Sequence, residues 1–241
     1  MKKLSFVCLF LFVSFAFAKG RPTFLYEKNL SEPSCSMEES WISHARKSFN
    51  NALQRRSKLN VSVEMQKACQ DIPMSHLLNN LCSFNDVSHL HIGLLHGNSF
   101  IAAQYMNESF IKECLGIEIT CRKLLLERCN ALLESKNYLI YEEDCFAFDK
   151  KRINYPVNVY FYDAGHSYSD QYNAFKYYDD VFADVFIAVI DDWSYSRVRK
   201  GTFDSFELLN YEILFQDFIP SNEKDGNGQY VAVIRKNKKS I

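Results

Sequence analysis

The sequence lacks any surplus of charge and has little glycine or proline. Its 241 residues include 28 Lys and Arg against 29 Asp and Glu, so it has no basic excess with which to neutralise a run of phosphates. Eight Gly and five Pro are too few for a collagen-like or low-complexity chain. We find no repeat of solenoid period, no CxxC pair and no zinc-ligand spacing. These absences argue against a nucleic-acid binder, a repeat protein and a structural zinc domain.

Hydrophobic residues make up 47% of the chain and aromatic residues 15%, which is enough for one globular domain with a sizeable core. The first eighteen residues differ from the rest. Lys2 and Lys3 precede an apolar run that ends in small residues at Ala16 and Ala18. This pattern predicts a signal peptide over residues 1–18 and a secreted or exported protein. The alternative is an uncleaved membrane anchor formed by residues 4–18, although that run is shorter than most membrane spans.

Removal of residues 1–18 leaves an odd number of cysteines, which cannot all pair within the chain. Several of them lie in apolar segments, among them Cys82 and Cys114, where a cysteine behaves as a small core residue. We therefore expect buried free thiols rather than a disulfide framework.

The predicted domain organisation has three parts: a signal peptide at 1–18, a connector and helical lead-in at 19–85, and one α/β domain at 86–238. In the lead-in, apolar residues recur at helical spacing from Glu38 to Arg56, and a second helix is predicted over Met74–Cys82.

After Val87, short β-prone runs alternate with helical segments, as in a sheet built from βαβ units. The predicted strands are Ser88–Ile92, Cys114–Ile117, Tyr138–Tyr141, Asn158–Tyr162, Val185–Ile190, Tyr211–Gln216 and Gln229–Ile234. The predicted helices between them are Ser99–Met106, Thr120–Ser135, Ser169–Val181 and Val198–Asn210. No helix separates the last two strands, so they should pair antiparallel. The predicted fold class is α/β, a doubly wound, mostly parallel seven-stranded sheet with an antiparallel edge strand.

Ligands of such sheets bind beyond the carboxyl ends of the strands. The first strand ends in a turn that contains Gly93 and Gly97, and the second ends at Glu118, roughly twenty residues on, the distance at which an acid accepts ribose hydroxyls in nucleotide-binding folds. Asp144 and Cys145 follow the third strand, where they could contact an adenine. Each signal has a simpler interpretation: a tight turn selects glycine without a ligand, and an acid before a helix is stabilised by the helix dipole.

The fourth strand runs into Asp163 and His166, and the fifth into Asp191 and Asp192. Carboxylates at neighbouring strand ends repel one another, and a bound Mg²⁺ or another divalent cation would offset that repulsion. His166 is the candidate general base, since its unperturbed pKa lies near neutrality. The alternative is that the two aspartates cap the next helix and that His166 bonds to backbone in a turn.

These segments resemble class I S-adenosylmethionine-dependent methyltransferases. The resemblance covers about residues 75–236 and is most specific in two motifs, Asp163-Ala164-Gly165-His166-Ser167-Tyr168 and Asp191-Asp192-Trp193. They are similar to the D-G-x-H-x-Y and D-D-W motifs of a branch that contains sugar and small-molecule O-methyltransferases. The resemblance implies a Rossmann-like methyltransferase fold.

The resemblance also implies roles for individual residues. Gly93 and Gly97 would face the methionine part of S-adenosylmethionine, with Ser99 near its carboxylate and Glu118 on its ribose. Asp144 and Cys145 would lie against adenine. Asp163, Asp191 and Asp192 would match metal ligands, and His166 would take the acceptor's proton. The sequence departs from the family at His91, where an acid that helps hold the cofactor is usual, and at Ala164, where Gly is usual.

The leading hypothesis is therefore a methyltransferase that acts on an oxygen of a small molecule or glycan. The alternative, which a signal peptide favours because the methyl donor is made in the cytosol, is an exported non-catalytic binding protein that retains the fold.

Overall fold

The computed structural model describes residues 36–61, 72–120, 123–134, 137–220 and 228–237 of the chain, which include all the elements named below. The proposed signal peptide and most of the connector lie outside the described residues. Within them, no helix combines the length and apolar character that crossing a bilayer requires.

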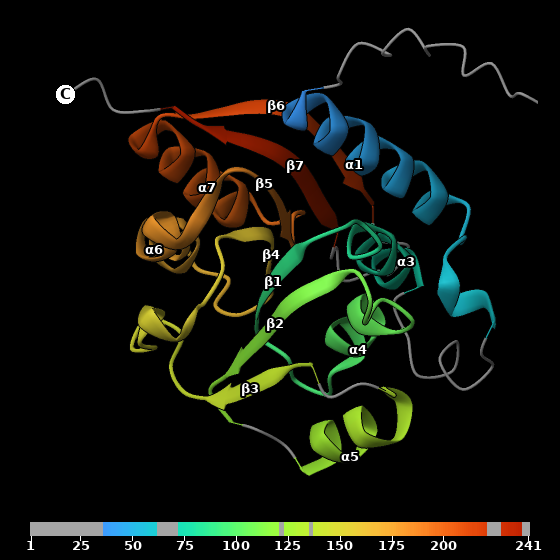
Figure 1. Ribbon diagram of the computed structural model, residues 1–241. Coiled ribbons are helices and arrows are strands. Elements are labelled where there is room, and N and C mark those ends of the chain that lie inside the picture. Colours follow the sequence, from blue (N-terminus) through green and yellow to red (C-terminus); the bar gives the residue numbers. More distant parts are fainter. Residues whose placement is uncertain (1–35, 62–71, 121–122, 135–136, 221–227, 238–241) are drawn as a thin grey trace, which may run out of the picture. The chain divides into compact units, whose positions relative to one another are not determined.

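A seven-stranded sheet forms the centre of the described chain (Figure 1), with strand order β3-β2-β1-β4-β5-β7-β6. Its strands are β1 (Val87–Ile92), β2 (Ile111–Glu118), β3 (Leu139–Glu142), β4 (Val157–Tyr162), β5 (Phe182–Ile190), β6 (Tyr211–Ile219) and β7 (Gln229–Lys236). The strands from β1 to β5 pair in parallel, and β7 pairs antiparallel with both β5 and β6. This confirms the predicted fold class, with the antiparallel strand β7 inserted beside the edge strand β6.

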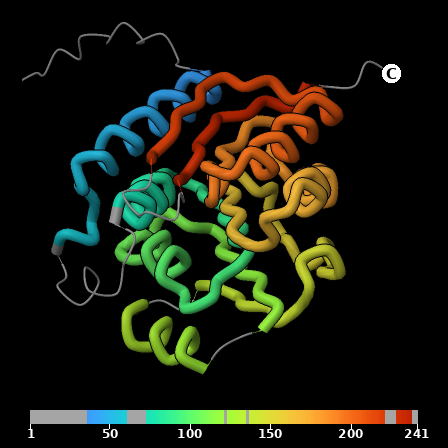
Figure 2. The backbone as a smooth tube through the Cα atoms, turned by 180° about the vertical axis from the view of Figure 1, so that it is seen from behind, coloured from blue at the N-terminus to red at the C-terminus, as the bar shows by residue number. Residues whose placement is uncertain are grey.

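Helices cover both faces of the sheet, as Figure 1 and the reverse view in Figure 2 show. They are α1 (Met37–Leu53), α3 (Ile72–Leu81), α4 (Asn98–Gln104), α5 (Lys123–Leu132), α6 (Tyr168–Tyr178) and α7 (Ser196–Leu209), with short 3₁₀ turns at Lys58–Val61, Lys150–Arg152 and Asp179–Val181. Helices α1, α3, α4 and α5 contribute to the core on one face, and α6 and α7 to the core on the other. The chain is therefore a three-layer α/β domain.

Strand β5 shows why the sheet is buried on both sides. Val185, Ile187 and Val189 enter one core, while Phe186 and Ile190 enter the other. Successive side chains of a strand point to opposite faces, so a continuous apolar run requires cover on both. Burial of this run supplies the hydrophobic stabilisation of the central strands.

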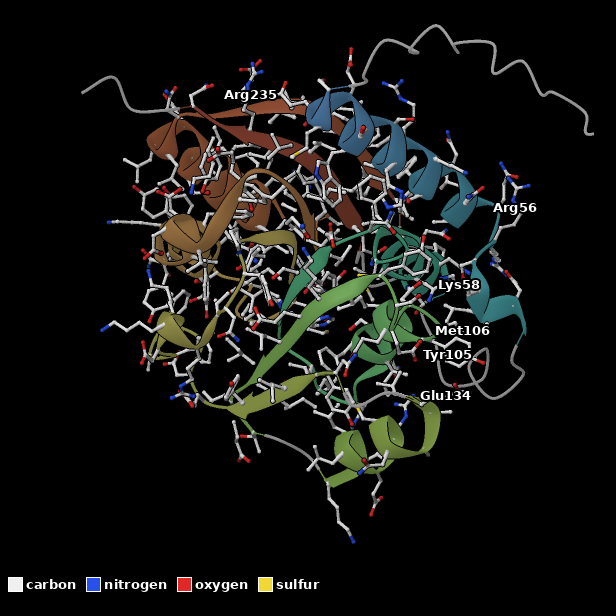
Figure 3. All side chains as sticks on the ribbon, viewed as in Figure 1. Arg56, Lys58, Tyr105, Met106, Glu134 and Arg235 are labelled. Atoms are coloured by element: carbon white, nitrogen blue, oxygen red, sulfur yellow. The ribbon has the colours of Figure 1, made fainter. Side chains whose placement is uncertain are left out.

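Polar contacts attach the N-terminal segment to the rest of the domain, and Figure 3 labels three of the residues that make them, Arg235, Lys58 and Met106. Arg235 of β7 donates to Glu38 of α1 at 2.9 Å and to Glu212 of β6 at 2.6 Å. Lys58 donates through Nζ to the carbonyl of Met106 at 2.7 Å, which joins the 3₁₀ turn at Lys58 to the end of α4. The described part of the lead-in thus packs as an integral part of the fold.

The predicted elements are all found, with shifts at their ends. The helix predicted to reach Val181 ends at Tyr178 and continues as a 3₁₀ turn, and the one predicted over Thr120–Ser135 covers Lys123–Leu132, with 121–122 and 135–136 outside the described residues. Strand β2 begins earlier than predicted, at Ile111. Cys82 and Cys114 are buried free thiols, as expected for these two, while Cys129 is buried and Cys145 half-buried.

Candidate functional site

A cavity of about 530 Å³ lies at the carboxyl ends of β1, β2, β3 and β4. Its walls come from four consecutive strand-to-helix connections, the positions at which open α/β sheets bind ligands. The lining residues are Ile92, Gly93, Leu95, Ile117, Glu118, Ile119, Glu143, Asp144, Cys145, Phe146, Tyr162, Asp163, Ala164, Gly165, His166 and Asp170. The sequence-predicted residues Gly93, Glu118, Asp144, Cys145, Asp163 and His166 are therefore brought together.

Gly93 forms the floor of the cavity where β1 meets β4. Its φ is +84°, and a Cβ at this position would lie 1.9 Å from the backbone oxygen of Asp163. Only glycine fits this conformation and this close approach. The neighbouring Leu95 also has a positive φ, 48°, and its side chain remains 55% exposed at the cavity wall. A leucine in this conformation is unusual and marks a turn that the surrounding structure determines.

Glu118, the last residue of β2, explains how this turn is held. Its Oε2 accepts the backbone N–H groups of Leu94 at 2.8 Å and of Leu95 at 2.7 Å. Its Oε1 accepts a long bond of 3.4 Å from the N–H of Thr120, the one donor to this oxygen among the described residues. The carboxylate therefore organises the glycine turn while it lines the cavity, which differs from the simpler interpretation of an acid that only stabilises a helix end.

His91, Gly97 and Ser99 do not line the cavity. His91 is fully buried, its Nε2 lies 3.1 Å from the Ser99 hydroxyl, and its ring packs against Phe100 and Phe161. Burial holds the pKa of His91 well below its usual value, so its ring is neutral. The assignment of these three residues to cofactor binding stays a prediction; in this geometry His91 and Ser99 join β1 to α4, and Gly97 begins that helix.

The residues after β3 form the opposite wall. Asp144 accepts the backbone N–H of Phe146 through Oδ1 at 2.9 Å. Cys145 and Phe146 follow it along the wall, and burial raises the pKa of the Cys145 thiol to about 12. A neutral thiol beside an aromatic ring is a suitable surface for a flat heterocycle.

At one end of the cavity, His166 lies between two carboxylates. Its Nε2 is 2.7 Å from Oδ2 of Asp192 and 3.7 Å from Oδ1 of Asp163. The carboxylates of Asp163 and Asp192 raise the pKa of His166 to about 10. Burial raises the pKa of Asp163 to about 7, and the carboxylates of Asp191 and Asp192 add to that effect. His166 is therefore protonated at neutral pH in this arrangement.

Asp191 occupies a different environment. It is buried, and its Oδ1 accepts a hydrogen bond from Nε2 of Gln229 at 2.8 Å. The alternative interpretation, in which Asp191 and Asp192 cap the next helix, is not what the structure has: the N-cap of α7 is Tyr195, with no side-chain capping bond. Asp192 contacts His166 of the site, and Asp191 contacts Gln229 of the neighbouring strand β7.

The donor atoms of Asp163, His166 and Asp192 lie within 4.8 Å of one another, and among the described residues they are the group whose geometry suits a metal ion. The Nε2 atom of His166 is buried yet makes no hydrogen bond of regular geometry, so its position fits metal ligation. One imidazole and two carboxylates suit Mn²⁺, Fe²⁺ or Zn²⁺ better than the all-oxygen Mg²⁺ site expected from sequence. The participation of Asp191 as a ligand stays a prediction.

The cavity wall is strongly acidic. Five carboxylates line it, those of Glu118, Glu143, Asp144, Asp163 and Asp170, and among the described residues no Lys or Arg lines it. Glu143 is paired with Arg152, and within the described part of the chain the other four carboxylates form no ion pair with a Lys or Arg. A cationic ligand is therefore favoured over a phosphate-bearing one.

Sequence reasoning missed Leu95, Ile119, Tyr162 and Asp170 as lining residues. Ile119 was detectable, because it directly follows the acid at the end of β2. Tyr162 precedes Asp163, and strand alternation alone assigns it to the core. Asp170 reaches the cavity because its carboxylate closes a capping box with Ser167 at the start of α6, a pattern that the sequence does display.

No known family model matches the chain, and no curated protein has a similar sequence. Solved structures share its fold. The cofactor-bound protein Rv0187 from MTB matches with a TM-score of 0.52 and 12% identity over 82% of this chain and 91% of that one. An O-methyltransferase from Bacillus cereus in complex with SAH matches with a TM-score of 0.50 and 12% identity over 83% and 100%.

The N-methyltransferase NodS from Bradyrhizobium japonicum matches with a TM-score of 0.51 and 12% identity over 73% of this chain and 97% of that one. The fold of this chain is therefore the Rossmann-like fold of class I methyltransferases. At these identities the likeness extends to the fold alone.

Proposed function

We propose that the chain is an S-adenosylmethionine-dependent methyltransferase that transfers a methyl group to an oxygen of a small molecule or glycan. The observation that carries the proposal is the acidic cavity at the carboxyl ends of β1 to β4. Its position in the sheet is where this fold binds ligands, and its negative charge suits a cationic cofactor. S-adenosylmethionine is a sulfonium cation without phosphate groups, whereas NAD and ATP carry phosphates that five carboxylates would repel.

In this proposal each end of the cavity takes one part of the cofactor. Glu118 accepts a ribose hydroxyl, and Asp144 with Cys145 and Phe146 bounds the adenine. Gly93 lets the ligand approach the backbone closely. The methyl group then lies toward Asp163 and His166. The neutral, buried His91 adds no positive charge beside the sulfonium, so its departure from the family pattern is compatible with binding.

His166 is the proposed base that removes the acceptor's proton. Its pKa of about 10 means that the imidazole is protonated at neutral pH and must first lose that proton to act as a base. A loss of its contacts with the carboxylates would lower the pKa and favour this deprotonation. A divalent cation at Asp163 and Asp192 would supply Lewis-acid polarisation of the acceptor hydroxyl. The residues present fit such an ion, but Nε2 of His166 cannot both ligate it and take the acceptor's proton, so the metal-bound protein would use the Lewis acid and the metal-free protein the imidazole.

Two further assignments belong to this proposal. The motifs at Asp163–Tyr168 and Asp191–Trp193 support membership of the branch that contains sugar and small-molecule O-methyltransferases. The apolar segment 4–18 supports export. An exported, non-catalytic binding protein with this fold is the alternative, and an activity measurement separates the two.

The experiment is a methyl-transfer assay with radiolabelled donor against a panel of sugars, glycans and catechols, with and without Mn²⁺. We expect transfer that His166→Gln lowers by about a hundredfold or more, as for other general bases. Glu127→Gln, a change on the exposed face of α5, is the control. Donor binding without transfer to any acceptor would favour the non-catalytic alternative.

A further inference from the structure

The two oxygens of the Glu118 carboxylate are used unequally. A carboxylate offers about four lone-pair sites, two on each oxygen. Leu94 and Leu95 take both sites of Oε2, with N–H donors at 2.8 Å and 2.7 Å. Thr120 takes one site of Oε1 at 3.4 Å. With these bonds from the described residues counted, one site is left, and it lies on Oε1, the oxygen that does not bind the turn.

The hydrogen bonds from Leu94 and Leu95 to Oε2 should persist when a ligand binds. Bonds between backbone N–H groups and an ionised carboxylate are of the strong, charge-assisted kind. Leu95 has a φ of 48°, so its conformation depends on such anchoring. The backbone on either side is also held, since the N–H of Gly93 donates to Ile117 at 2.9 Å and that of Gly97 to Leu94 at 2.7 Å.

Glu118 is equally constrained from the other side. Its own backbone oxygen accepts the N–H of Glu143 at 3.0 Å, so the residue is fixed between β1 and β3. A rotation that presented both carboxylate oxygens to a ligand would break two short bonds to the turn. Binding of two vicinal hydroxyls, one on each oxygen, is therefore disfavoured here.

We propose that Glu118 forms a hydrogen bond with only one of the two ribose hydroxyls, through Oε1, and that its Oε2 remains bonded to the glycine turn. The inference rests on the proposed function, because it concerns how the nucleoside of that cofactor is recognised. It makes Glu118 a positioning residue for the turn and a specificity-determining residue for one hydroxyl.

The test compares the binding of S-adenosylhomocysteine with that of its 2′-deoxy and 3′-deoxy analogues by titration calorimetry on the full chain. We expect one analogue to bind about tenfold or more weakly, because it leaves an ionised oxygen unpaired, and the other to bind within about twofold of the parent. Similar losses for both analogues, or no loss for either, would overturn the inference while leaving the proposed function intact.

Two variants sharpen the comparison. Glu118→Gln should weaken binding of the parent compound and reduce the deoxy penalty to about twofold, since the hydroxyl then faces an uncharged group. Glu142→Gln is the matched control: Glu142 pairs in register with Glu118 on β3 but is not a lining residue. It should retain the full discrimination. If S-adenosylhomocysteine does not bind the folded wild-type chain at all, the proposed function fails, and the inference fails with it.

Discussion

The Nε2 atom of His166 lies 2.7 Å from Oδ2 of Asp192, closer than to Asp163, which is three residues away in sequence. The pair bridges the ends of β4 and β5. Asp192 is buried and has a φ of 55°, a conformation that an Asp tolerates better than most residues. Together with Asp163, this contact raises the pKa of the candidate base.

The pKa of His166 should therefore depend on Asp192. A raised histidine pKa stabilises the fold fully below the unfolded value of 6.5, and this stabilisation is lost as the pH rises through about 10. In metal-free protein we expect NMR of the imidazole to show titration near pH 10. Asp192→Asn should move it towards neutrality, and Asp184→Asn, an exposed change elsewhere on β5, should not. Titration near 6.5 in the wild type would contradict the role of the pair.

Metal binding gives a second prediction. Mn²⁺ at a hundredfold excess over its Kd should stabilise the protein by about 2.7 kcal/mol, or roughly 5–10 °C in Tm for a chain of this size. His166→Gln and Asp192→Asn should each remove the shift, whereas Asp184→Asn should retain it. An equal shift in all four proteins, measured by differential scanning calorimetry, would place the ion elsewhere.

The two glycines of the β1 turn should differ in their tolerance of alanine. At Gly93 the added Cβ meets the backbone oxygen of Asp163 at 1.9 Å, while at Gly97 it meets the end of the Leu125 side chain at 2.4 Å. Both have positive φ, so both changes add strain. We expect Gly93→Ala to cost about 2 kcal/mol or more in the free energy of unfolding and to abolish ligand binding. Gly97→Ala should cost less, and equal costs in urea denaturation would refute this ranking.

The sequence predicts the features of this fold that depend on residues close together in the chain. Strand β5 and helix α7 follow from local periodicity, because both patterns are set by burial of nearby side chains. The gathering of Gly93, Glu118, Asp144 and Asp163 in one cavity follows from the rule that parallel strands end together.

Other features depend on contacts that no local pattern contains. The bond from Gln229 to Asp191 joins residues 38 positions apart, so the sequence could not separate Asp191 from Asp192. The use of Glu118 by the turn depends on the left-handed conformation of Leu95, which a leucine does not signal. The sequence predicts His166 as a base, but its pairing with Asp192 depends on the register of β4 and β5.

Tyr160 and Tyr162 provide a prediction about stability. Both lie on β4, both are buried, and neither hydroxyl has a hydrogen-bond partner among the described residues. Removing a buried, unpaired hydroxyl relieves its desolvation cost, so Tyr160→Phe and Tyr162→Phe should leave the free energy of unfolding unchanged or raise it by up to about 1 kcal/mol. A loss of more than about 1 kcal/mol in urea titration would reveal a partner, such as an ordered water.

The most direct test of the proposed function is the binding of S-adenosylmethionine to the full chain by titration calorimetry, with ATP as the phosphate-bearing comparison. We expect S-adenosylmethionine to bind with micromolar affinity and ATP not to bind. The binding of S-adenosylmethionine should be strongly weakened in Glu118→Ala and retained in Glu142→Ala. A folded protein that binds ATP, or that gives no heat with S-adenosylmethionine in the presence or absence of Mn²⁺, would contradict the proposed function.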